Sequence, residues 1–352
     1  RSANVYAAGA LDDLIVDALL PLWRDAPIDR GRGPVALWWL RYARRGEHLK
    51  LRLHAVADGV ADDALDALGR ALEARISQTF TALGEPRKPE GRSPNDAPPV
   101  DREDADPAPA EDRTLLWTHY QRSPVSLGAH ELMQDDAFCA RMAAAYAAAA
   151  DVLFTQLDET TTGHTADKKA SGDDTPRGGR LAAARLGLLF RLAAAGLAAT
   201  DAGGSADAHT RYLTYHRDWL LRFLLPRPDA ERTLIVRTLT RFDQEIEALP
   251  DARRDALLAT AHNYRPGTAA PDDETPAMRR WRDAMRALVD RAGPLCRHLE
   301  ATIDPYADDP IDSAIFNLLN GVANLLGVRT LQEAYVYHLL LHASATTDDR
   351  PG

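Results

Sequence analysis

Cysteine and lysine are both scarce in this sequence. Cys139 and Cys296 are the only cysteines among 352 residues, and neither lies beside a residue with metal-ligand spacing. Disulfide scaffolds and cysteine-based zinc sites are therefore excluded as organising features of the fold. Lysine occurs only four times, so arginine supplies most of the positive charge.

The sequence also lacks the runs and motifs that mark several common classes of protein. No apolar run of 18 residues, signal peptide or anchor is evident, so we expect a cytoplasmic protein with no membrane partner. The GxGxxG, Walker A, HExxH and GxSxG motifs are absent, which removes the usual support for nucleotide-binding, metallopeptidase and α/β-hydrolase functions. The formal net charge of −10 argues against a general nucleic-acid binder.

The remaining composition is that of an ordinary globular protein, with 45% hydrophobic and 27% charged residues. A chain of this length can bury a large core, and we expect one domain that spans residues 1–352. Three polar stretches contain few large apolar side chains and are expected to be flexible insertions. They lie near residues 85–112, 158–180 and 265–276.

The segment from Val35 to His54 has the clearest pattern in the chain. Its first half is dense in β-forming residues and its second half alternates strictly between apolar and polar side chains, with a turn at Arg44–Gly46 between them. The pattern predicts a strand pair with one apolar face and one basic face. The basic face is either solvated or a floor for an anionic or amide-rich ligand, formed by Arg41, Lys50 and Arg52.

The other predicted elements favour an α+β fold, in which helices cover an antiparallel sheet and the C-terminal half is mostly helical. The first half adds strands at Asn4–Tyr6 and Leu115–Arg122 and helices at Leu11–Trp23 and Asp62–Leu83. Later helices are expected at Ala137–Leu157, Leu181–Leu197, Ala206–Leu225, Ala230–Leu249, Asp251–Asn263, Met278–Ile303, Ile311–Leu326 and Leu331–Ala343. Gly293–Pro294 is expected to break or kink the helix that contains it.

The hairpin segment LRYARRGEHLKLRLH, residues 40–54, resembles the strand–turn–strand signature (RY…G.HLRLR) of the thiopeptide-type biosynthesis family. This family includes the C-terminal glutamate-elimination domains of lantibiotic dehydratases and the stand-alone pyridine synthases of thiopeptide pathways. Tyr120–Gly128 resembles the pyridine-synthase branch because it has Arg-Ser-x-Val-Ser-x-Gly where elimination domains carry RYGG. Tyr212–Leu220 is similar to the YL.YH..WL helix of the same branch, and Phe316–Gly327 with Glu333 looks like the C-terminal N.LLG……E element.

The resemblance implies a reaction on a ribosomally made precursor peptide, with no cofactor and no metal. Two dehydroalanines would join in a formal aza-[4+2] cycloaddition, after which water and the leader peptide leave and a pyridine-centred macrocycle remains. Contact with other enzymes of the pathway is a further expectation. The usual H.HxNR version of the last element is absent, which fits a chemistry other than glutamate elimination. The alternatives are the elimination subunit of a split dehydratase and a non-catalytic leader-binding partner.

The implied reaction requires side chains that transfer protons and side chains that form hydrogen bonds with the substrate. His216 is the predicted proton shuttle, and its alternative is a core histidine bonded to a carbonyl. Tyr215 or Tyr212 would donate to the leaving hydroxyl, although either also suits an amphipathic core. Ser123 and Ser126 would hydrogen-bond the iminol or the hydroxyl, and the competing interpretation is turn chemistry.

Two further sets complete the predicted site. Asn317, Asn320 and Asn324 share one helix face, where an asparagine is costly unless bonded, and Asn320 is favoured for substrate or backbone amide contacts over a solvated stripe. An acidic leader peptide is expected to bind the basic residues of the hairpin, which are Arg41, Arg44, Arg45, Lys50 and Arg52. His338 and His342 are spaced for a metal but lack an identifiable third ligand, so a surface or core role is expected.

Overall fold

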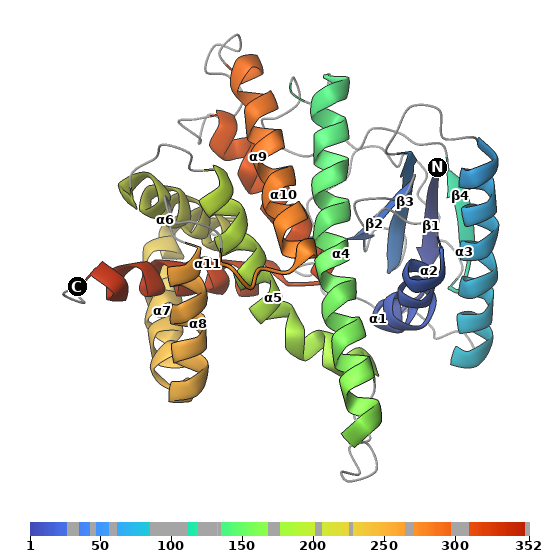
Figure 1. Cartoon of the computed structure of the whole chain (residues 1–352). Coiled ribbons are helices and arrows are strands. Elements are labelled where there is room, and N and C mark those ends of the chain that lie inside the picture. The colour runs from blue at the N-terminus through green and yellow to red at the C-terminus, as the bar shows by residue number, and fades with distance from the viewer. Residues whose placement is uncertain are drawn as a thin grey trace.

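The computed structural model describes residues 1–26, 35–42, 47–55, 62–84, 112–118, 132, 135–167, 177–200, 206–224, 228–264, 271–296 and 310–348. These residues form a small antiparallel sheet beside a larger assembly of helices (Figure 1). The predicted α+β class, with a mostly helical C-terminal half, is confirmed.

The sheet contains four strands in the order β2-β3-β1-β4. Their bounds are Ser2–Tyr6 for β1, Val35–Tyr42 for β2, His48–Ala55 for β3 and Leu115–Thr118 for β4. The predicted hairpin is the β2–β3 pair, with Trp39 opposite Leu51. The predicted continuation of the last strand to Arg122 lies outside the described residues.

The N-terminal helix follows the prediction, with one local departure from α-helical geometry. It consists of α1 (Leu11–Leu14), a π-helical turn (Ile15–Leu19) and α2 (Leu20–Asp25). The wide turn precedes Pro21, whose ring lacks an N–H and crowds the preceding turn of a regular helix. Helix α3 (Asp62–Leu83) has the predicted bounds and packs against β3 and the N-terminal helix.

Eight further helices complete the described part of the chain. They are α4 (Asp136–Asp167), α5 (Arg177–Thr200), α6 (Ala206–Phe223), α7 (Pro228–Glu247), α8 (Asp251–Asn263), α9 (Pro276–Cys296), α10 (Pro310–Leu326) and α11 (Thr330–Asp348). In Figure 1 the sheet lies between α4 on one side and α3 on the other, and α6, α7, α8 and α11 gather at the far end.

One hydrophobic core connects the sheet with the helices. It contains fully buried side chains from both parts, among them Trp39, Phe154 and Trp281. Helices α4 and α10 pack against β2, α4 also packs along α9, and α6 packs along α11. Helix α10 therefore contacts the sheet as well as α4, α9, α5 and α11.

Helix α4 corrects the expectation that no apolar run reaches 18 residues. Its segment Asp136–Glu159 is long and apolar enough to cross a membrane by length and composition. Most of that segment is buried inside the fold, as in the core helix of a globular protein, so this is weak evidence for a membrane span.

Three predicted boundaries also differ from the structure. Residues 158–167 and 177–180 belong to α4 and α5, so these parts of the second polar stretch are helical, because an established helix extends at little cost even through Thr and Gly of low helix propensity. Residues 271–275 are described and place the side chain of Glu274 in the interior. Pro294 lies inside α9, which ends at Cys296, and the predicted remainder to residue 303 lies outside the described residues.

Candidate functional site

His216 lies in an aromatic cluster between α6 and α10. Its ring stacks on Phe316, with centroids 4.2 Å apart and planes inclined by 9°. Tyr212 packs at 4.4 Å and Tyr215 approaches edge-on at 5.0 Å. The structure therefore brings the predicted His216, Tyr212 and Tyr215 together, with His216 at 3% exposure, Tyr212 also buried and Tyr215 half-buried.

Burial decides the ionisation of His216. It lowers the pKa of the imidazole to about 3, because the charged form loses its hydration. The side chain is therefore neutral at pH 7, with one donor and one acceptor nitrogen. Histidine is the residue type that titrates nearest neutral pH, but desolvation inside the fold removes that property from His216, and its role as proton shuttle stays a prediction.

Three of the predicted site residues, on α6 and α10, carry buried polar atoms that lack a hydrogen-bond partner within the described residues. These atoms are the Tyr212 hydroxyl, His216 Nδ1 and Asn317 Nδ2. Leaving such a group unsatisfied costs about 1–3 kcal/mol. Native structures contain few such groups, and the rings of Tyr212 and His216 lie only 4.4 Å apart, so a polar ligand at this place would supply partners to both.

A carboxylate from α11 lies beside this cluster. Glu333 is 2% exposed, and its two oxygens accept hydrogen bonds from Asn320 Nδ2 at 2.9 Å and from the Tyr337 hydroxyl at 3.2 Å. Burial raises the pKa of Glu333 to about 7, against the opposing effect of these two bonds. After burial itself, the coulombic effects of Asp312 and Glu333 also raise the pKa of Tyr212, which links the carboxylate electrostatically to the His216 cluster.

Glu333 is the member of this cluster that the site prediction did not include, although the sequence motif ended on it. Its neighbours Ala334 and Val336 are fully buried, and Tyr337 follows one helical turn later. An acidic residue in such an apolar helix is the signal that could have identified it. We designate Tyr212, His216, Asn317, Asn320 and Glu333 the polar cluster.

Asn324 differs from the other two asparagines because both ends of its carboxamide form hydrogen bonds with the sheet. The backbone N–H of Arg41 donates to Asn324 Oδ1 at 2.6 Å, and Asn324 Nδ2 donates to the Arg41 carbonyl at 2.9 Å. Asn324 therefore pairs with the edge strand β2 as another strand would. This corrects its predicted role in substrate binding, because both ends of the amide are engaged.

Two residues of the predicted basic face of the hairpin, Arg41 and Arg52, bind other side chains inside the fold. Arg41 is bound by Asp12 at 2.8 Å, and Arg185 binds the same carboxylate. Burial lowers the pKa of Arg41 to about 10, and Asp12 opposes this effect. Arg52 is 2% exposed and donates to Ser2 Oγ at 2.7 Å, so it is not available on an open surface.

Of the remaining predicted residues, Lys50 is the one that lies within the described part of the chain. Lys50 is half-buried and lies over the Tyr42 ring, with Nζ 5.4 Å from the ring centroid. The other four predicted residues, Arg44, Arg45, Ser123 and Ser126, lie outside the described residues.

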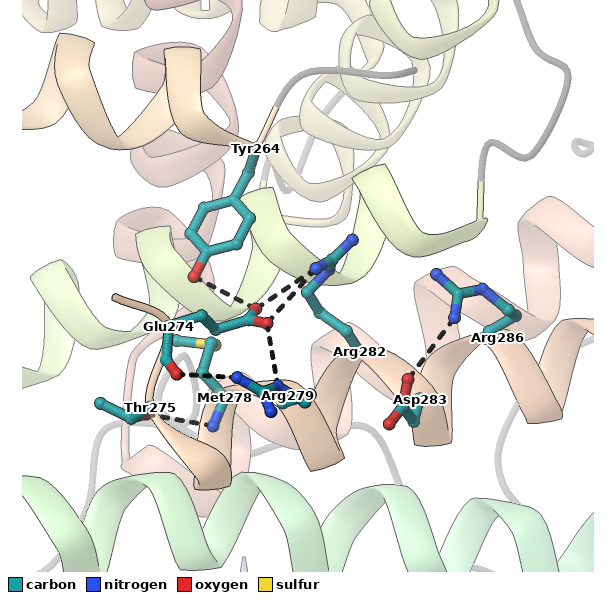
Figure 2. A network of polar contacts seen from close by, with 8 residues as sticks. All are labelled: Tyr264, Glu274, Thr275, Met278, Arg279, Arg282, Asp283 and Arg286. Carbon is teal, nitrogen blue, oxygen red and sulfur yellow. Dashed lines mark hydrogen bonds and ion pairs between the residues drawn. The ribbon is translucent and has the colours of Figure 1, made fainter. Parts of the chain in front are cut away.

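A second polar network surrounds Glu274, at the start of α9 (Figure 2). Its carboxylate lies 3.4 Å from Arg282 Nη1 and accepts a bond of 3.5 Å from the Tyr264 hydroxyl. Thr275 Oγ1 caps the helix by accepting from the Met278 N–H at 3.2 Å. This arrangement suits a helix start, where acidic groups and hydroxyl caps satisfy free N–H groups, so we assign the network a structural role.

Metal ligation has no evident site within the described residues, where no three His, Cys, Asp or Glu side chains could together hold an ion. His338 instead contacts two side chains of the same chain. Its Nδ1 lies 3.2 Å from Arg217 Nη1, which can only donate, and its Nε2 lies 2.7 Å from Asp243 Oδ1. The expectation that no metal or cofactor is needed stays a prediction.

Comparison with known proteins identifies related sequences and folds. The family described as lantibiotic biosynthesis dehydratase C-term matches residues 1–344. Among solved structures, the chain is similar to the pyridine synthase TbtD from thiomuracin biosynthesis, with 21% identity, a TM-score of 0.58 and coverage of 98% of this chain and 97% of that one. TsrL matches with 14% identity, a TM-score of 0.54 and coverage of 99% and 95%.

A third solved structure is the tRNA-dependent lantibiotic dehydratase MibB from Microbispora sp. 107891. It matches with 16% identity and a TM-score of 0.42, over 99% of this chain and 28% of that one. No curated protein matches the chain. At these identities the matches to TbtD and TsrL establish a shared fold.

Proposed function

The chain belongs to the lantibiotic biosynthesis dehydratase C-terminal family, and from this premise we propose that it is a pyridine synthase of a thiopeptide pathway. Membership confirms the resemblance inferred from the four sequence motifs. The observation that carries the proposal is the match to a pyridine synthase along almost the whole of both chains. The polar cluster supports it, because its unpartnered atoms suit a substrate rich in amide groups.

The proposed reaction begins on a precursor peptide that contains two dehydroalanines. The amide N–H of one dehydroalanine moves its proton to the oxygen, which creates the azadiene, and the alkene of the other adds across it with two new carbon–carbon bonds. Loss of water and then of the leader peptide as a carboxamide leaves an aromatic pyridine. No electrons enter or leave, so the demands on the protein are positioning and proton transfer.

The polar cluster supplies groups for both demands. The Tyr212 hydroxyl is protonated at neutral pH, because burial raises its pKa well above 10, and it would donate to the departing hydroxyl. A neutral His216 would accept or donate through Nδ1, and Asn317 Nδ2 would donate to an amide oxygen of the substrate. A well-placed acid or base contributes about 10²–10⁴-fold to the rate.

Mass spectrometry tests the proposed reaction against its alternatives. The protein is incubated with a linear, azole-bearing precursor that contains two dehydroalanines, and separately with a precursor glutamylated on serine. We expect an intact leader carboxamide and a macrocycle from the first peptide. Loss of glutamate from the second peptide alone would indicate an elimination enzyme, and binding without any mass change would indicate a leader-binding partner.

Tyr212→Phe tests the role of the polar cluster. This variant removes one oxygen that has no partner among the described residues, so we expect the fold to be retained while the rate of macrocycle formation falls at least tenfold. The matched control is Tyr335→Phe on α11, outside the polar cluster, whose ring packs edge-on against Phe242. Equal rates for both variants would contradict the assignment of Tyr212.

Leader recognition by the basic turn is a separate part of the proposal. Since Arg41 and Arg52 are paired inside the fold, we assign binding of an acidic leader to Arg44 and Arg45. The double variant with glutamate at both positions should weaken leader binding at low ionic strength. Unchanged affinity in a titration of the leader peptide would show that the assignment is wrong.

A further inference from the structure

The contact between Glu333 and Asn320 fixes the orientation of a side-chain amide in the polar cluster. The carboxylate can only accept hydrogen bonds when ionised, so the Asn320 group 2.9 Å away must be its NH2 end. Asn320 is half-buried, and its Oδ1 makes no hydrogen bond within the described part of the chain. The carbonyl end of the amide is therefore the end left for a ligand.

We propose that Glu333 is a positioning residue that selects which end of the Asn320 carboxamide faces the substrate. With Glu333 ionised, Asn320 presents Oδ1 as an acceptor for a peptide N–H of the substrate. This inference rests on the proposed function, in which the proton of a substrate amide must be held before it moves to the amide oxygen. An acceptor aimed at that N–H orients the amide for the transfer.

Protonation of Glu333 reverses the orientation of the Asn320 carboxamide. A protonated carboxyl group donates from its O–H, so its best partner is Asn320 Oδ1, and the amide turns to present its NH2 end. Because burial raises the pKa of Glu333 to about 7, both states are populated near neutral pH. The amide orientation thus depends on pH in the range where the enzyme would act.

Several groups surround Glu333 and share in this equilibrium. Tyr337 donates to Oε1 from the same helix, and Asn320 donates to Oε2 from α10. On α6, Tyr212 interacts electrostatically with both Glu333 and Asp312 of α10. The raised pKa of Tyr212 and of Tyr337 keeps both phenols neutral up to high pH, so Glu333 is the member of this group that changes charge near pH 7.

The first experiment follows the amide itself by NMR. Protein labelled with 15N-asparagine is titrated from pH 5 to pH 9, with Asn320→Gln used to assign the side-chain resonance. We expect the Asn320 NH2 signals to shift with a midpoint near pH 7 in the wild type and to stay constant in Glu333→Gln. Tyr337→Phe removes a donor to the carboxylate and should move the midpoint to higher pH.

The second experiment measures the pH profile of kcat/KM for macrocycle formation. In the wild type, kcat/KM should fall below pH 7 as Glu333 takes up a proton. Glu333→Gln should lose about tenfold at pH 8, the loss of roughly one oriented hydrogen bond, and its profile should be flat around pH 7. Combining Glu333→Gln with Asn320→Ala should add little further loss, because both changes remove the same contact.

The outcomes separate this inference from the proposed function. Asn320 signals that do not titrate in the wild type, or a Glu333→Gln variant with the wild-type pH profile, overturn the inference and leave the proposed function in place. If no macrocycle forms although the Asn320 signals titrate as expected and folding is intact, the proposed function fails alone. Should Glu333→Gln fold poorly, the shift of the midpoint in Tyr337→Phe decides the inference.

Discussion

At the scale of single residues, burial gives two side chains ionisation states that their residue types do not suggest. His216 is a histidine that stays neutral far into the acid range, and Glu333 is a carboxylic acid that titrates near pH 7. Both shifts arise chiefly from desolvation, since the polar cluster lies in the interior. Of these two residues, the glutamate is therefore the one suited to take up and release a proton at neutral pH.

His216→Phe tests the ionisation of the histidine through stability. Below pH 6.5 the unfolded chain binds a proton at His216 that the folded chain binds only near pH 3, so the wild type loses stability as the pH falls through this window. Phenylalanine keeps a flat ring against Phe316 and cannot be protonated. The variant should gain about 2 kcal/mol relative to the wild type between pH 7 and pH 5.

Urea unfolding of both proteins at pH 7 and pH 5 provides this measurement. Phe316→Leu is the control, because it disturbs the same stack without removing a titratable group, and its stability should follow the wild-type pH dependence. A His216→Phe protein whose stability changes with pH as the wild type does would contradict the neutral assignment.

At the scale of elements, the three asparagines on one face of α10 have different surroundings. Its asparagines at 317, 320 and 324 recur at helical spacing, yet the first has a buried Nδ2 with no partner among the described residues, the second bonds α11 and the third bonds β2. Trp39 Nε1 adds a bond of 3.1 Å to the carbonyl of Leu325 at the end of the helix. Helix α10 therefore attaches the sheet to the helices that form the polar cluster.

Asn324→Ala tests the attachment of α10 to the sheet. The change leaves the N–H and the carbonyl of Arg41 without their partner at the edge of β2, so we expect a loss of about 2 kcal/mol in the free energy of unfolding. Amide hydrogen exchange should rise at Arg41, where the N–H loses its acceptor. Gln244→Ala, at an exposed position of α7, is the comparison and should change stability by less than about 0.5 kcal/mol.

Gly321→Ala tests the contact between α10 and α4. A Cβ at this position would lie 2.7 Å from Cε1 and Cζ of Tyr146, whose ring stacks on Trp38 at 4.8 Å. The helix cannot accept the methyl group without moving the tyrosine, so we expect a loss of about 1–3 kcal/mol instead of the gain that alanine usually gives in a helix. Thermal unfolding measures the change, and adding Tyr146→Leu should recover most of it. Stabilisation by Gly321→Ala alone would contradict the close contact.

At the scale of the whole molecule, polar contacts reinforce the shared hydrophobic core. Asp151 on α4 accepts a bond of 2.9 Å from Trp23 Nε1 on α2 and also binds Arg280 on α9. Asp12 on α1 joins Arg41 of the sheet to Arg185 of α5. The Trp23–Asp151 hydrogen bond and the Asp12–Arg185 ion pair connect the first quarter of the chain to its helical remainder, which favours a single cooperative domain.

Equilibrium unfolding tests the single-domain prediction. The tryptophans report on both parts, since Trp38 and Trp39 lie in the sheet and Trp219 and Trp281 lie in the helices. We expect urea transitions followed by tryptophan fluorescence and by far-ultraviolet circular dichroism to coincide. Two separated transitions would show that the sheet and the helices unfold as independent units.

Local patterns in the sequence predicted most of the elements but fewer of their boundaries. The alternation at residues 48–54 identified β3 and its buried leucines, because strand periodicity is visible within a few positions. The extension of α4 to Asp167 was missed because no apolar periodicity marks the polar sequence after Leu157. The roles of Arg44, Arg45, Ser123 and Ser126 stay predictions, since they lie outside the described residues.

The sequence by itself determined the family, the fold class and the residue types at the candidate site. Only the tertiary structure decided which polar atoms are satisfied, since Asn324 bonds a strand residue 283 positions away and Asn320 bonds Glu333 on the next helix. The physical reason is that periodicity depends on neighbours in sequence, whereas desolvation and hydrogen bonding depend on every group that the fold brings close. Two asparagines on one helix face therefore have different roles, one toward the sheet and one toward the polar cluster.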